Sequence, residues 1–422
     1  MKRALDVYID KTQVGKLTDE NNIWAFEYTT GWLASQHRHP LSPHIALEAG
    51  KQIDGSSFRP VQWFFDNLLP EEKARELLAR HVKVPVEDAF QLLKEAGAES
   101  AGAITLMPEG EEVAPGTVHK LTYEEVNQRI LNLPQVPLNR AERKRMSVAG
   151  AQHKMLVIYR HGELLEPSGF FPSTHILKPQ HSSPEVYYHT VRNEWFVMTL
   201  AGLCGLEVPP VDIRYLPEPV YLIERFDRAG EYPHQHRRHV LDGCQLLNLG
   251  PHMKYPNSNA GSLNKLAELT RMKARTKIDI FRWALFNALV GNGDAHLKNL
   301  SFFINKEDVV MTPHYDLLST AIYEAPHKHM DHQLSQQMGD AQYLGQLTVP
   351  NILAFAEELQ LPTKLAKREL DRLIGKIEQE AIPLMQQVQD APAHPGKGGE
   401  IRMIKEIYYN CIKEMVTKLT KA

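Results

Sequence analysis

The sequence predicts an α+β fold, with a mixed α/β N-terminal part and an all-α C-terminal part. Short apolar runs typical of strands alternate with helical stretches as far as residue 226. Beyond Asp227 the apolar residues recur at helical spacing, as in Lys277 to Val290 and Thr363 to Val388. At about 100 to 200 residues per domain, a length of 422 residues indicates two or three domains.

The composition is that of an ordinary globular protein. Hydrophobic residues make up 43% and charged residues 23% of the chain, which excludes wholesale disorder, collagen and coiled coil. The formal charge of -3 argues against coating nucleic acid by bulk charge. Cys204, Cys244 and Cys411 are too few for a disulfide framework. We find no signal peptide and no apolar run of about 20 residues, so we expect a cytoplasmic protein with no membrane partner.

The first predicted domain covers residues 1–107. The segment Leu5 to Leu17 alternates apolar and polar residues about a central turn, which predicts a β-hairpin. Pro, Ser and Gly are dense from Pro40 to Phe65, which predicts a loop. Two helices that begin with Pro are predicted next, at Pro70 to Arg80 and Pro85 to Ala96. The acidic segment Met107 to Gly116, rich in Pro and Gly, predicts a linker.

Residues 108–226 predict a second mixed unit, the N-lobe, and residues 227–422 a helical C-lobe. The predicted strands of the N-lobe are Met155 to Tyr159, Thr174 to Leu177, Val211 to Tyr215 and Val220 to Ile223. Among them lies a helical segment, Glu185 to Cys204, which Gly205 follows as at many helix ends. The further C-lobe helices are predicted at Asn351 to Leu359 and Glu400 to Lys418.

The segment Gly291 to Phe303 is the most informative about function. It follows an apolar helix and precedes a β-prone run, so Asp294 to Asn299 should form a loop at the edge of a core. Phosphoryl transfer uses an Asp to orient the attacking hydroxyl and an Asn to hold Mg2+. Protein kinases place them as Asp, four residues, Asn. Asp294 and Asn299 have this spacing.

Three more residues follow the protein-kinase order. Asp316, after the predicted strand Val309 to Met311, would be a second metal ligand. Lys178 at the end of a strand would steady phosphates, and Glu194 in the next helix would pair with Lys178. Each feature alone is more common as an ordinary loop or surface charge. Their common order favours a two-lobed protein-kinase-like fold.

The sequence also resembles a known family over nearly its whole length, the HipA toxin serine/threonine kinases of bacterial toxin–antitoxin modules. The motifs that carry the resemblance are Ser147-Val148-Ala149-Gly150-Ala151-Gln152-His153-Lys154, Thr174-His175-Ile176-Leu177-Lys178, Glu224-Arg225-Phe226-Asp227-Arg228, Gly293-Asp294-Ala295-His296-Leu297-Lys298-Asn299 and Tyr315-Asp316. As a set they are specific.

The resemblance implies a role for each matched position. Asp294 would be the catalytic residue, and Asn299 and Asp316 would bind Mg2+. The residues implied for ATP are the phosphate loop Ala149, Gly150, Ala151, Gln152, His153 and Lys154, the pair Lys178 and Glu194, the hinge backbone at Glu224 and Phe226, and the pocket residues His296 and Tyr315. His153 stands where the family often has Glu, which could change how the loop closes on nucleotide.

The resemblance marks Ser147 as an autophosphorylation site. Four cations precede it, Arg140, Arg143, Lys144 and Arg145. Local sequence alone favours a solvated basic turn with a capping Ser. With the motif included, we expect that phosphate on Ser147 draws the loop toward these cations and switches the kinase off.

The resemblance also implies partners. It implies a small HipB-like helix-turn-helix antitoxin that binds operator DNA and represses transcription, and a protein substrate, typically glutamyl-tRNA synthetase, whose phosphorylation leads to growth arrest and persistence. A basic stripe, Lys364, Lys367, Arg368, Arg372 and Lys376, is usually a solvated face, here balanced by Glu369 and Asp371. Contact of this stripe with DNA phosphate is the less favoured alternative.

Three alternatives stay open. A small-molecule kinase of the aminoglycoside type would share the Gly-Asp-x4-Asn pattern. A non-catalytic corepressor module would keep the fold alone, although the presence of Asp294, Asn299, Asp316 and Lys178 argues against it. The third alternative is a zinc site, for which a surface loop is the favoured interpretation. The residues whose spacing would suit zinc are His327, His329, Asp331 and His332.

Overall fold

A computed structural model describes the chain except for residue 1 and a small number of internal and terminal positions. The described residues are 2–97, 99–111, 116–133, 135, 138, 152–169, 171–306, 308–325 and 327–421. They form two compact units. Unit 1 consists of Met1–Ser182, Arg214–Met253 and Phe302–Val310, and unit 2 of Ser183–Ile213, Lys254–Ser301 and Met311–Ala422. The domain boundaries expected at residues 107 and 226 stay predictions.

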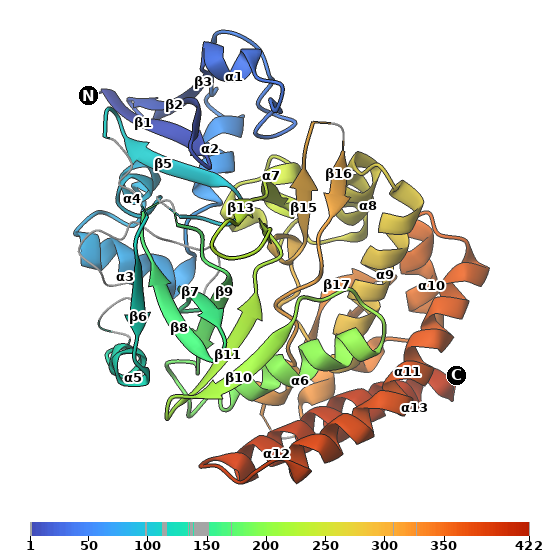
Figure 1. Cartoon of the computed structure of the whole chain (residues 1–422). Helices are drawn as coiled ribbons and strands as arrows, with labels where there is room; N and C mark the ends of the chain where they lie inside the picture. The colour runs from blue at the N-terminus through green and yellow to red at the C-terminus, as the bar shows by residue number, and fades with distance from the viewer. Residues whose placement is uncertain are drawn as a thin grey trace. The chain divides into compact units, whose positions relative to one another are not determined.

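The first sheet of unit 1 has five strands in the order β4-β3-β2-β1-β5 (Figure 1). Their bounds are β1 Lys2–Ile9, β2 Thr12–Glu20, β3 Ile23–Tyr28, β4 Lys51–Ile53 and β5 Ile104–Pro108. The antiparallel pair β1 and β2 confirms the predicted hairpin, with Leu5 opposite Leu17. Leu5, Val7, Val14 and Leu17 are fully buried, because alternate side chains of a strand point to one face.

Four helices accompany this sheet: α1 Thr30–Ala34, α2 Pro60–Asp66, α3 Glu72–Val82 and α4 Ala89–Ala96. Helices α3 and α4 confirm the two helices predicted there, but neither begins at the predicted Pro: α3 starts at Glu72 and α4 at Ala89. The loop predicted from Pro40 to Phe65 was wrong in two places, because the strand β4 lies within it and α2 begins at Pro60. The carboxylate of the buried Asp54 accepts hydrogen bonds from the backbone N–H groups of Val61 (2.9 Å) and Gln62 (2.8 Å). Asp54 therefore provides hydrogen-bond acceptors for backbone N–H groups in the first turn of α2, although it lies several residues before the helix.

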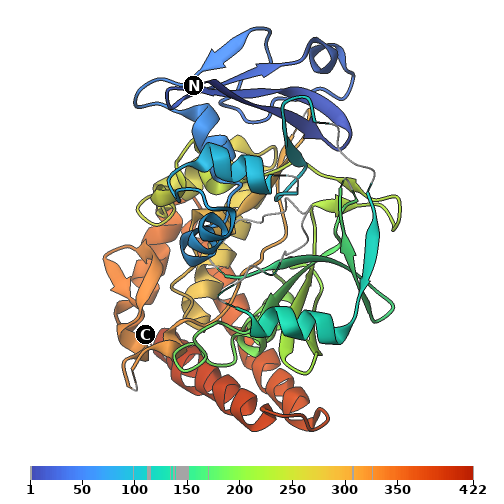
Figure 2. The ribbon, with the colours of Figure 1, turned by 90° about the vertical axis from the view of Figure 1, so that its left-hand side faces the viewer.

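The second sheet of unit 1 has six strands in the order β10-β11-β9-β7-β8-β6. Their bounds are β6 Val118–Leu121, β7 Met155–Arg160, β8 Glu163–Pro167, β9 His175–Pro179, β10 Val211–Tyr215 and β11 Pro219–Glu224. They confirm the four strands predicted there. Helix α5, Tyr123–Leu131, is capped by Thr122 and packs Val126 against Met155 and Leu177. In Figure 2 this sheet, in green, is separate from the blue N-terminal sheet.

Smaller elements follow, which lie in unit 1 apart from the end residues Ser301 and Met311: β12 Arg228–Ala229, β13 His236–Arg237, β14 Val240–Asp242, α7 Gly243–Leu246, β15 Ser301–Ile304 and β16 Val309–Met311. The strands β14, β15 and β16 form a three-stranded sheet. Strands β15 and β16 confirm the β-prone run and the strand predicted after Asn299.

A buried ion cluster ties the early chain to the second sheet. The Arg225 guanidinium donates to both oxygens of Asp227, at 2.9 and 2.6 Å, and lies 3.3 Å from Glu99. Arg228 lies 3.1 Å from Glu99. Burial alone would raise the pKa of Glu99 and Asp227, but the surrounding guanidinium groups outweigh it and hold each pKa below its usual value. Arg225, Asp227 and Arg228 of the Glu224 to Arg228 motif therefore have a structural role.

Unit 2 is mainly helical. Its helices are α6 Thr190–Leu203, α8 Ala260–Leu269, α9 Lys273–Val290, α10 Val349–Glu358, α11 Thr363–Asp390, α12 Lys397–Glu406 and α13 Lys413–Thr420, with a π-helical turn at Ile407–Ile412 and a hairpin of β17 Gln333–Met338 and β18 Ala341–Tyr343. These helices include each helix that the sequence predicted in this region. The prediction that the part after residue 226 is all-α was wrong, because this part also contains the strands β12 to β18. Figure 1 shows α11, α12 and α13 beside one another in red.

Helix α9 is the central element of unit 2. Phe281, Trp283, Leu285 and Phe286 cover more than one side of the helix and are almost fully buried. A helix that is apolar on several sides is expected to lie inside a protein, and this one is followed directly by the loop that contains Asp294. Among the described residues, no helix combines the length and apolar character that crossing a bilayer requires.

Candidate active site

Helix α9 ends at Gly291, and the backbone then turns into the loop that holds Asp294. Gly291 has φ +70°, and a Cβ there would come within 2.9 Å of the Ala321 side chain. The position therefore favours glycine. Next to it, Asn292 accepts a hydrogen bond from the Asp294 N–H at 3.0 Å, and its own Nδ2 donates to Asn287 in α9 at 2.8 Å. Asp294 is thus fixed to the end of a buried helix.

Asn299 closes the same loop. It lies in a short 3-10 helix, Leu297–Asn299, and its Nδ2 donates to the Asp294 carbonyl at 3.1 Å. This bond sets the orientation of the amide and directs Oδ1 away from the Asp294 carbonyl. Within the described part of the chain, Oδ1 of Asn299 accepts no hydrogen bond. An amide oxygen of this kind suits a hard cation such as Mg2+.

The segment that contains Asp316 is bound to both ends of this loop. Tyr315 donates to the Lys298 carbonyl at 2.7 Å and lies 2.6 Å from the Ser301 hydroxyl. At the other end, the Gly293 N–H donates to the Thr320 hydroxyl at 2.7 Å. The structure therefore gathers the elements that carry Asp294, Asn299 and Asp316.

Asp316 itself has φ +60°, a conformation that non-glycine residues rarely adopt. Such conformations persist where the surrounding structure fixes them, and they cluster at functional sites. Here the bonds of Tyr315 and Thr320 fix the backbone on both sides of Asp316.

Helix α6 docks on the same segment. Asn193 donates to the Ser319 carbonyl and accepts from the Ser319 N–H, both at 2.8 Å. The next residue, Glu194, is only 3% exposed, so it is not on a solvated face of the helix. A buried carboxylate needs a partner or a ligand; the role predicted for Glu194 stays a prediction.

Two residues at this site were not predicted from the sequence. The Tyr255 hydroxyl donates to Oδ1 of Asp294 at 2.5 Å, and its ring meets that of His296 edge to face at 4.9 Å. Gln336, in β17, donates to the Ala295 carbonyl and to the Ser258 hydroxyl. Both are far from Asp294 in sequence and belong to no motif. His296 thus packs on Tyr255, and the hydroxyl of Tyr315 binds the Asp294 to Asn299 loop through the Lys298 carbonyl.

The residues predicted to hold phosphate lie in unit 1. Lys178 is 4% exposed in β9, and its ammonium lies 5.7 Å from the ring centre of Tyr221, its cross-strand neighbour in β11. Lys178 thus projects from a fixed strand position, not from a solvated surface. Glu194 belongs to unit 2, and its pairing with Lys178 stays a prediction.

The phosphate loop is described in part. Ser147, Ala149, Gly150 and Ala151 lie outside the described residues, as does the basic run Arg140 to Arg145. Gln152 donates to the Pro179 carbonyl at 3.3 Å, next to Lys178. Burial, followed by the charges of His181 and Lys73, lowers the pKa of His153. His153 is therefore neutral at pH 7, and Lys154 is partly buried beside it.

The predicted hinge residues lie at the end of β11. Glu224 is exposed and pairs in register with His175, whereas Phe226 is half-buried and meets Phe303 edge to face at 6.0 Å. Between them, the Arg225 N–H donates to the Thr174 carbonyl at 2.9 Å. Their contact with adenine stays a prediction.

Histidines of the possible zinc cluster have hydrogen-bond partners within the protein. His332 bonds to Glu324 (2.9 Å) and Thr320 (2.7 Å), and His329 to the Ala321 carbonyl (2.8 Å). Across the described ranges, no group of three or more His, Cys, Asp or Glu side chains is arranged to hold a metal ion.

The basic stripe on α11 is largely paired within the protein. Lys367 pairs with Asp371, Lys376 with Glu380, and Arg372 with Glu369. Glu369 is 4% exposed and also binds Arg282 of α9 at 2.8 Å, so it is not a solvated counter-charge. The role of Lys364, Lys367, Arg368, Arg372 and Lys376 in DNA contact stays a prediction.

Comparison with known proteins decides the family. A model of the HipA-like C-terminal domain matches residues 146–381, and a model of the HipA N-terminal domain matches residues 5–107. The chain belongs to the HipA family. It is 34% identical over 396 residues to the serine/threonine-protein kinase toxin HipA of Shewanella oneidensis, covering 89% of this chain and 88% of that protein.

Two further comparisons agree. This HipA-family chain is 32% identical over 402 residues to a putative kinase of Sinorhizobium fredii, covering 92% and 93% of the two chains. A solved complex of Shewanella oneidensis HipA with HipB and its operator DNA matches with a TM-score of 0.82 at 29% identity, over 99% of both chains. The predicted kinase-like α+β fold and the predicted class of enzyme, a serine/threonine-protein kinase, are confirmed.

Proposed function

We propose that this HipA-family kinase transfers the γ-phosphate of ATP to a serine, with Asp294 orienting the attacking hydroxyl. The observation that carries the proposal is the fixing of the Asp294 to Asn299 loop. One end is bound through Asn292 and Thr320, and the other through the Tyr315 hydroxyl. Phosphoryl transfer depends mainly on such positioning, because the protein does little covalent chemistry.

Asn299 and Asp316 would hold Mg2+. An amide oxygen and a carboxylate are suitable ligands, and Mg2+ in kinases is usually bound by one or two carboxylates together with phosphate oxygens. When bound, the metal supplies positive charge that stabilises the negative charge of the phosphates during transfer. Lys178, Glu194 and the loop up to Lys154 are proposed to hold the nucleotide, with its adenine against the backbone at Glu224 and Phe226 and near His296 and Tyr315.

We further propose that the chain is the toxin of a toxin–antitoxin pair. The solved complex of the Shewanella protein contains HipB and operator DNA, so a helix-turn-helix antitoxin is the proposed partner here. The proposed protein substrate is a translation component, typically glutamyl-tRNA synthetase, and the proposed consequence is growth arrest and persistence. Autophosphorylation at Ser147 is proposed to end the activity.

The substrate proposal is tested by incubating the purified full chain with ATP, Mg2+ and glutamyl-tRNA synthetase, followed by mapping of phosphopeptides. The proposal expects phosphoserine on the synthetase and on Ser147, and no transfer after a chelator removes the metal. Phosphorylation of Ser147 without any on the synthetase would contradict the substrate and leave the kinase assignment in place. Phosphorylation of an aminoglycoside alone would contradict the protein-kinase activity.

A further inference from the structure

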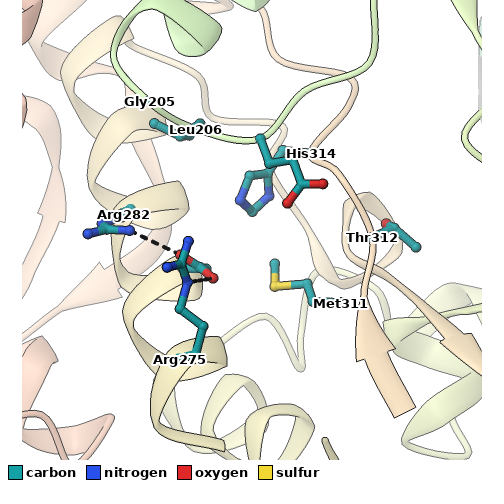
Figure 3. Close-up of a pocket in the computed structure, with 9 residues that line it drawn as sticks. Gly205, Leu206, Arg275, Arg282, Met311, Thr312 and His314 are labelled. Atoms are coloured by element: carbon teal, nitrogen blue, oxygen red, sulfur yellow. Dashed lines mark hydrogen bonds and ion pairs between the residues drawn. The ribbon is translucent and has the colours of Figure 1, made fainter. Parts of the chain in front are cut away.

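A cavity of about 190 Å3 lies within unit 2, and none of its lining residues belongs to the Asp294 loop. Three segments line it: the turn after α6, part of α9, and the end of β16 with the chain that follows it. Figure 3 shows Arg275 and Arg282 on α9 at one side of the view, and Met311 and His314 at the other. The family comparisons assign nothing to this cavity.

The arginine side of the cavity keeps unused hydrogen-bond donors. Arg275 donates through Nε to Asp279 at 2.6 Å, and Arg282 uses Nε on Glu369 and Nη1 on Asp279. Within the described chain, neither terminal nitrogen of Arg275, nor Nη2 of Arg282, makes a hydrogen bond. Guanidinium groups of this kind bind a carboxylate through paired hydrogen bonds.

His314 supplies a second, independent observation. It is only 5% exposed, yet neither ring nitrogen has a hydrogen-bond partner among the described residues, and Nδ1 is buried. Its backbone N–H donates to the Glu207 carbonyl at 2.7 Å, which fixes the residue against the turn after α6. An imidazole always carries at least one N–H donor, and leaving a buried donor unsatisfied is unfavourable. The other ring nitrogen, Nε2, is not enclosed in the same way, so the imidazole can present its N–H there to a polar ligand in the cavity.

Glu207 adds a negative charge at the edge of the same cavity. Its side chain is exposed and makes no ion pair or hydrogen bond within the described residues. It nevertheless acts on Arg275: the pKa of Arg275 is raised first by its hydrogen bond to Asp279 and, more weakly, by the charge of Glu207. A carboxylate and a guanidinium thus border one cavity without contacting each other.

The lining charges therefore balance, with Arg275 and Arg282 against Asp279 and Glu207. A balanced pair of opposite, separated charges fits a ligand that carries both signs better than a simple anion, because an anion would be repelled by Glu207. The volume holds about six water molecules at roughly 30 Å3 each. It is smaller than the range of about 300 to 1,000 Å3 typical of drug-sized ligands, and Leu206 and Met311 offer an apolar wall.

We propose that this cavity binds a free α-amino acid as its zwitterion. The ligand carboxylate lies at Arg275, Arg282 and His314, the ammonium group at Glu207, and the body of the ligand beside Leu206 and Met311. The site is separate from the Asp294 loop, although His314 lies two residues before Asp316. The inference needs no kinase activity, so it stands or fails independently of the proposed function.

Titration calorimetry of the full chain with each of the common L-amino acids, without ATP, tests the site. At least one is expected to bind at millimolar concentration or below. Its C-terminal amide and its N-acetyl derivative should each bind about tenfold more weakly or worse, because each lacks one charge. Failure of every amino acid to bind would overturn the proposal. So would inorganic phosphate or acetate binding as tightly as the best amino acid.

Two variants locate the ligand. Arg275 and Glu207 are both exposed, so the variants Arg275→Gln and Glu207→Gln should fold. Each substitution is expected to weaken binding about tenfold or more. Lys273→Gln is the matched control, since Lys273 lies on the same helix, pairs with Glu268 and does not line the cavity. Its affinity should equal that of the parent. Unchanged affinity in Glu207→Gln would overturn the assignment of the ammonium position and with it the zwitterion.

Discussion

The Tyr255 hydroxyl donates a 2.5 Å hydrogen bond to Oδ1 of Asp294. This bond orients the carboxylate that is proposed to accept a hydrogen bond from a substrate hydroxyl. Tyr255 is itself backed by His296 and by the ammonium of Lys254, 4.9 Å from its ring centre. Tyr255 is therefore a positioning residue for the proposed catalytic carboxylate.

Tyr255→Phe should lower the kcat of phosphate transfer about tenfold with little change in the KM for ATP. A hydrogen bond to a charged group contributes about 1.5 to 3 kcal/mol, and about 1.4 kcal/mol corresponds to tenfold in rate. Steady-state kinetics on the purified chain measures both constants. Tyr409→Phe, exposed on the π-helical turn, is the control. A rise in the KM for ATP with unchanged kcat would contradict a positioning role.

Thr320→Val should reduce both stability and kcat. The substitution removes the acceptor of the Gly293 N–H, which lies directly before Asp294. An unsatisfied, partly buried donor costs about 1 to 3 kcal/mol. Thermal unfolding and transfer rates provide the measurements, with Thr420→Val near the C-terminus as the control, because that hydroxyl bonds only within its own helix end. If Thr320→Val behaved like the control, the loop would not depend on this bond.

Asp227→Asn should destabilise unit 1 by about 3 to 5 kcal/mol, because it leaves Arg225 buried without its main partner. Hydrogen exchange of the backbone amides in β9 and β11 would report the loss. Glu231→Gln is a suitable control, since Glu231 is exposed on the turn that follows. Equal protection of these amides in both variants would show that the cluster does not hold the sheet.

The same cluster predicts how stability depends on pH. The pKa values of Asp227 and Glu99 are lower in the folded chain than their ordinary values, near about 4. Their contribution to stability is therefore complete above pH of about 4 and is lost as the pH falls further, when the buried carboxylates take up protons. The parent should lose stability steeply in this acid range, and Asp227→Asn should lose it less steeply. Parallel acid curves for the two proteins would contradict this assignment.

Ser147→Asp should abolish autophosphorylation and weaken the binding of ATP, if phosphate on Ser147 withdraws the loop from the nucleotide. Ser147→Ala is the comparison, because it also prevents modification but adds no charge. Fluorescent nucleotide binding distinguishes the two. A Ser147→Asp protein that bound ATP and transferred phosphate at the parent rate would exclude the switch.

The sequence predicted those parts of the fold that depend on local pattern. The alternation around Leu5 and Leu17 predicted a hairpin, and the spacing of apolar residues predicted α9 and α11. Helix α2 was missed, because its start is stabilised by Asp54, which lies in a segment rich in turn residues. A helix satisfied by a carboxylate outside its own first turn has no signature in a short window.

The candidate site shows the same division. Asp294 and Asn299 lie in one loop, so their spacing was visible in the sequence, and the structure places a hydrogen bond between the Asn299 side chain and the Asp294 carbonyl. Tyr255 and Thr320 reach this loop from 39 and 27 residues away, respectively. Contacts of this range arise from packing, and no motif marked them. The ionic role of Arg225 and Asp227 was likewise hidden, because Glu99 comes from a distant segment.

Transfer of labelled phosphate from ATP by the parent and by Asp294→Asn tests the central claim most directly. Asp371→Asn is the matched control, because Asp371 is exposed on α11 and pairs only with Lys367 in the described structure. The account predicts that Asp294→Asn lowers transfer to the chain itself and to glutamyl-tRNA synthetase by about a hundredfold or more, while Asp371→Asn stays at the parent rate. Equal labelling by the parent and Asp294→Asn would contradict the assignment of Asp294 as the catalytic residue.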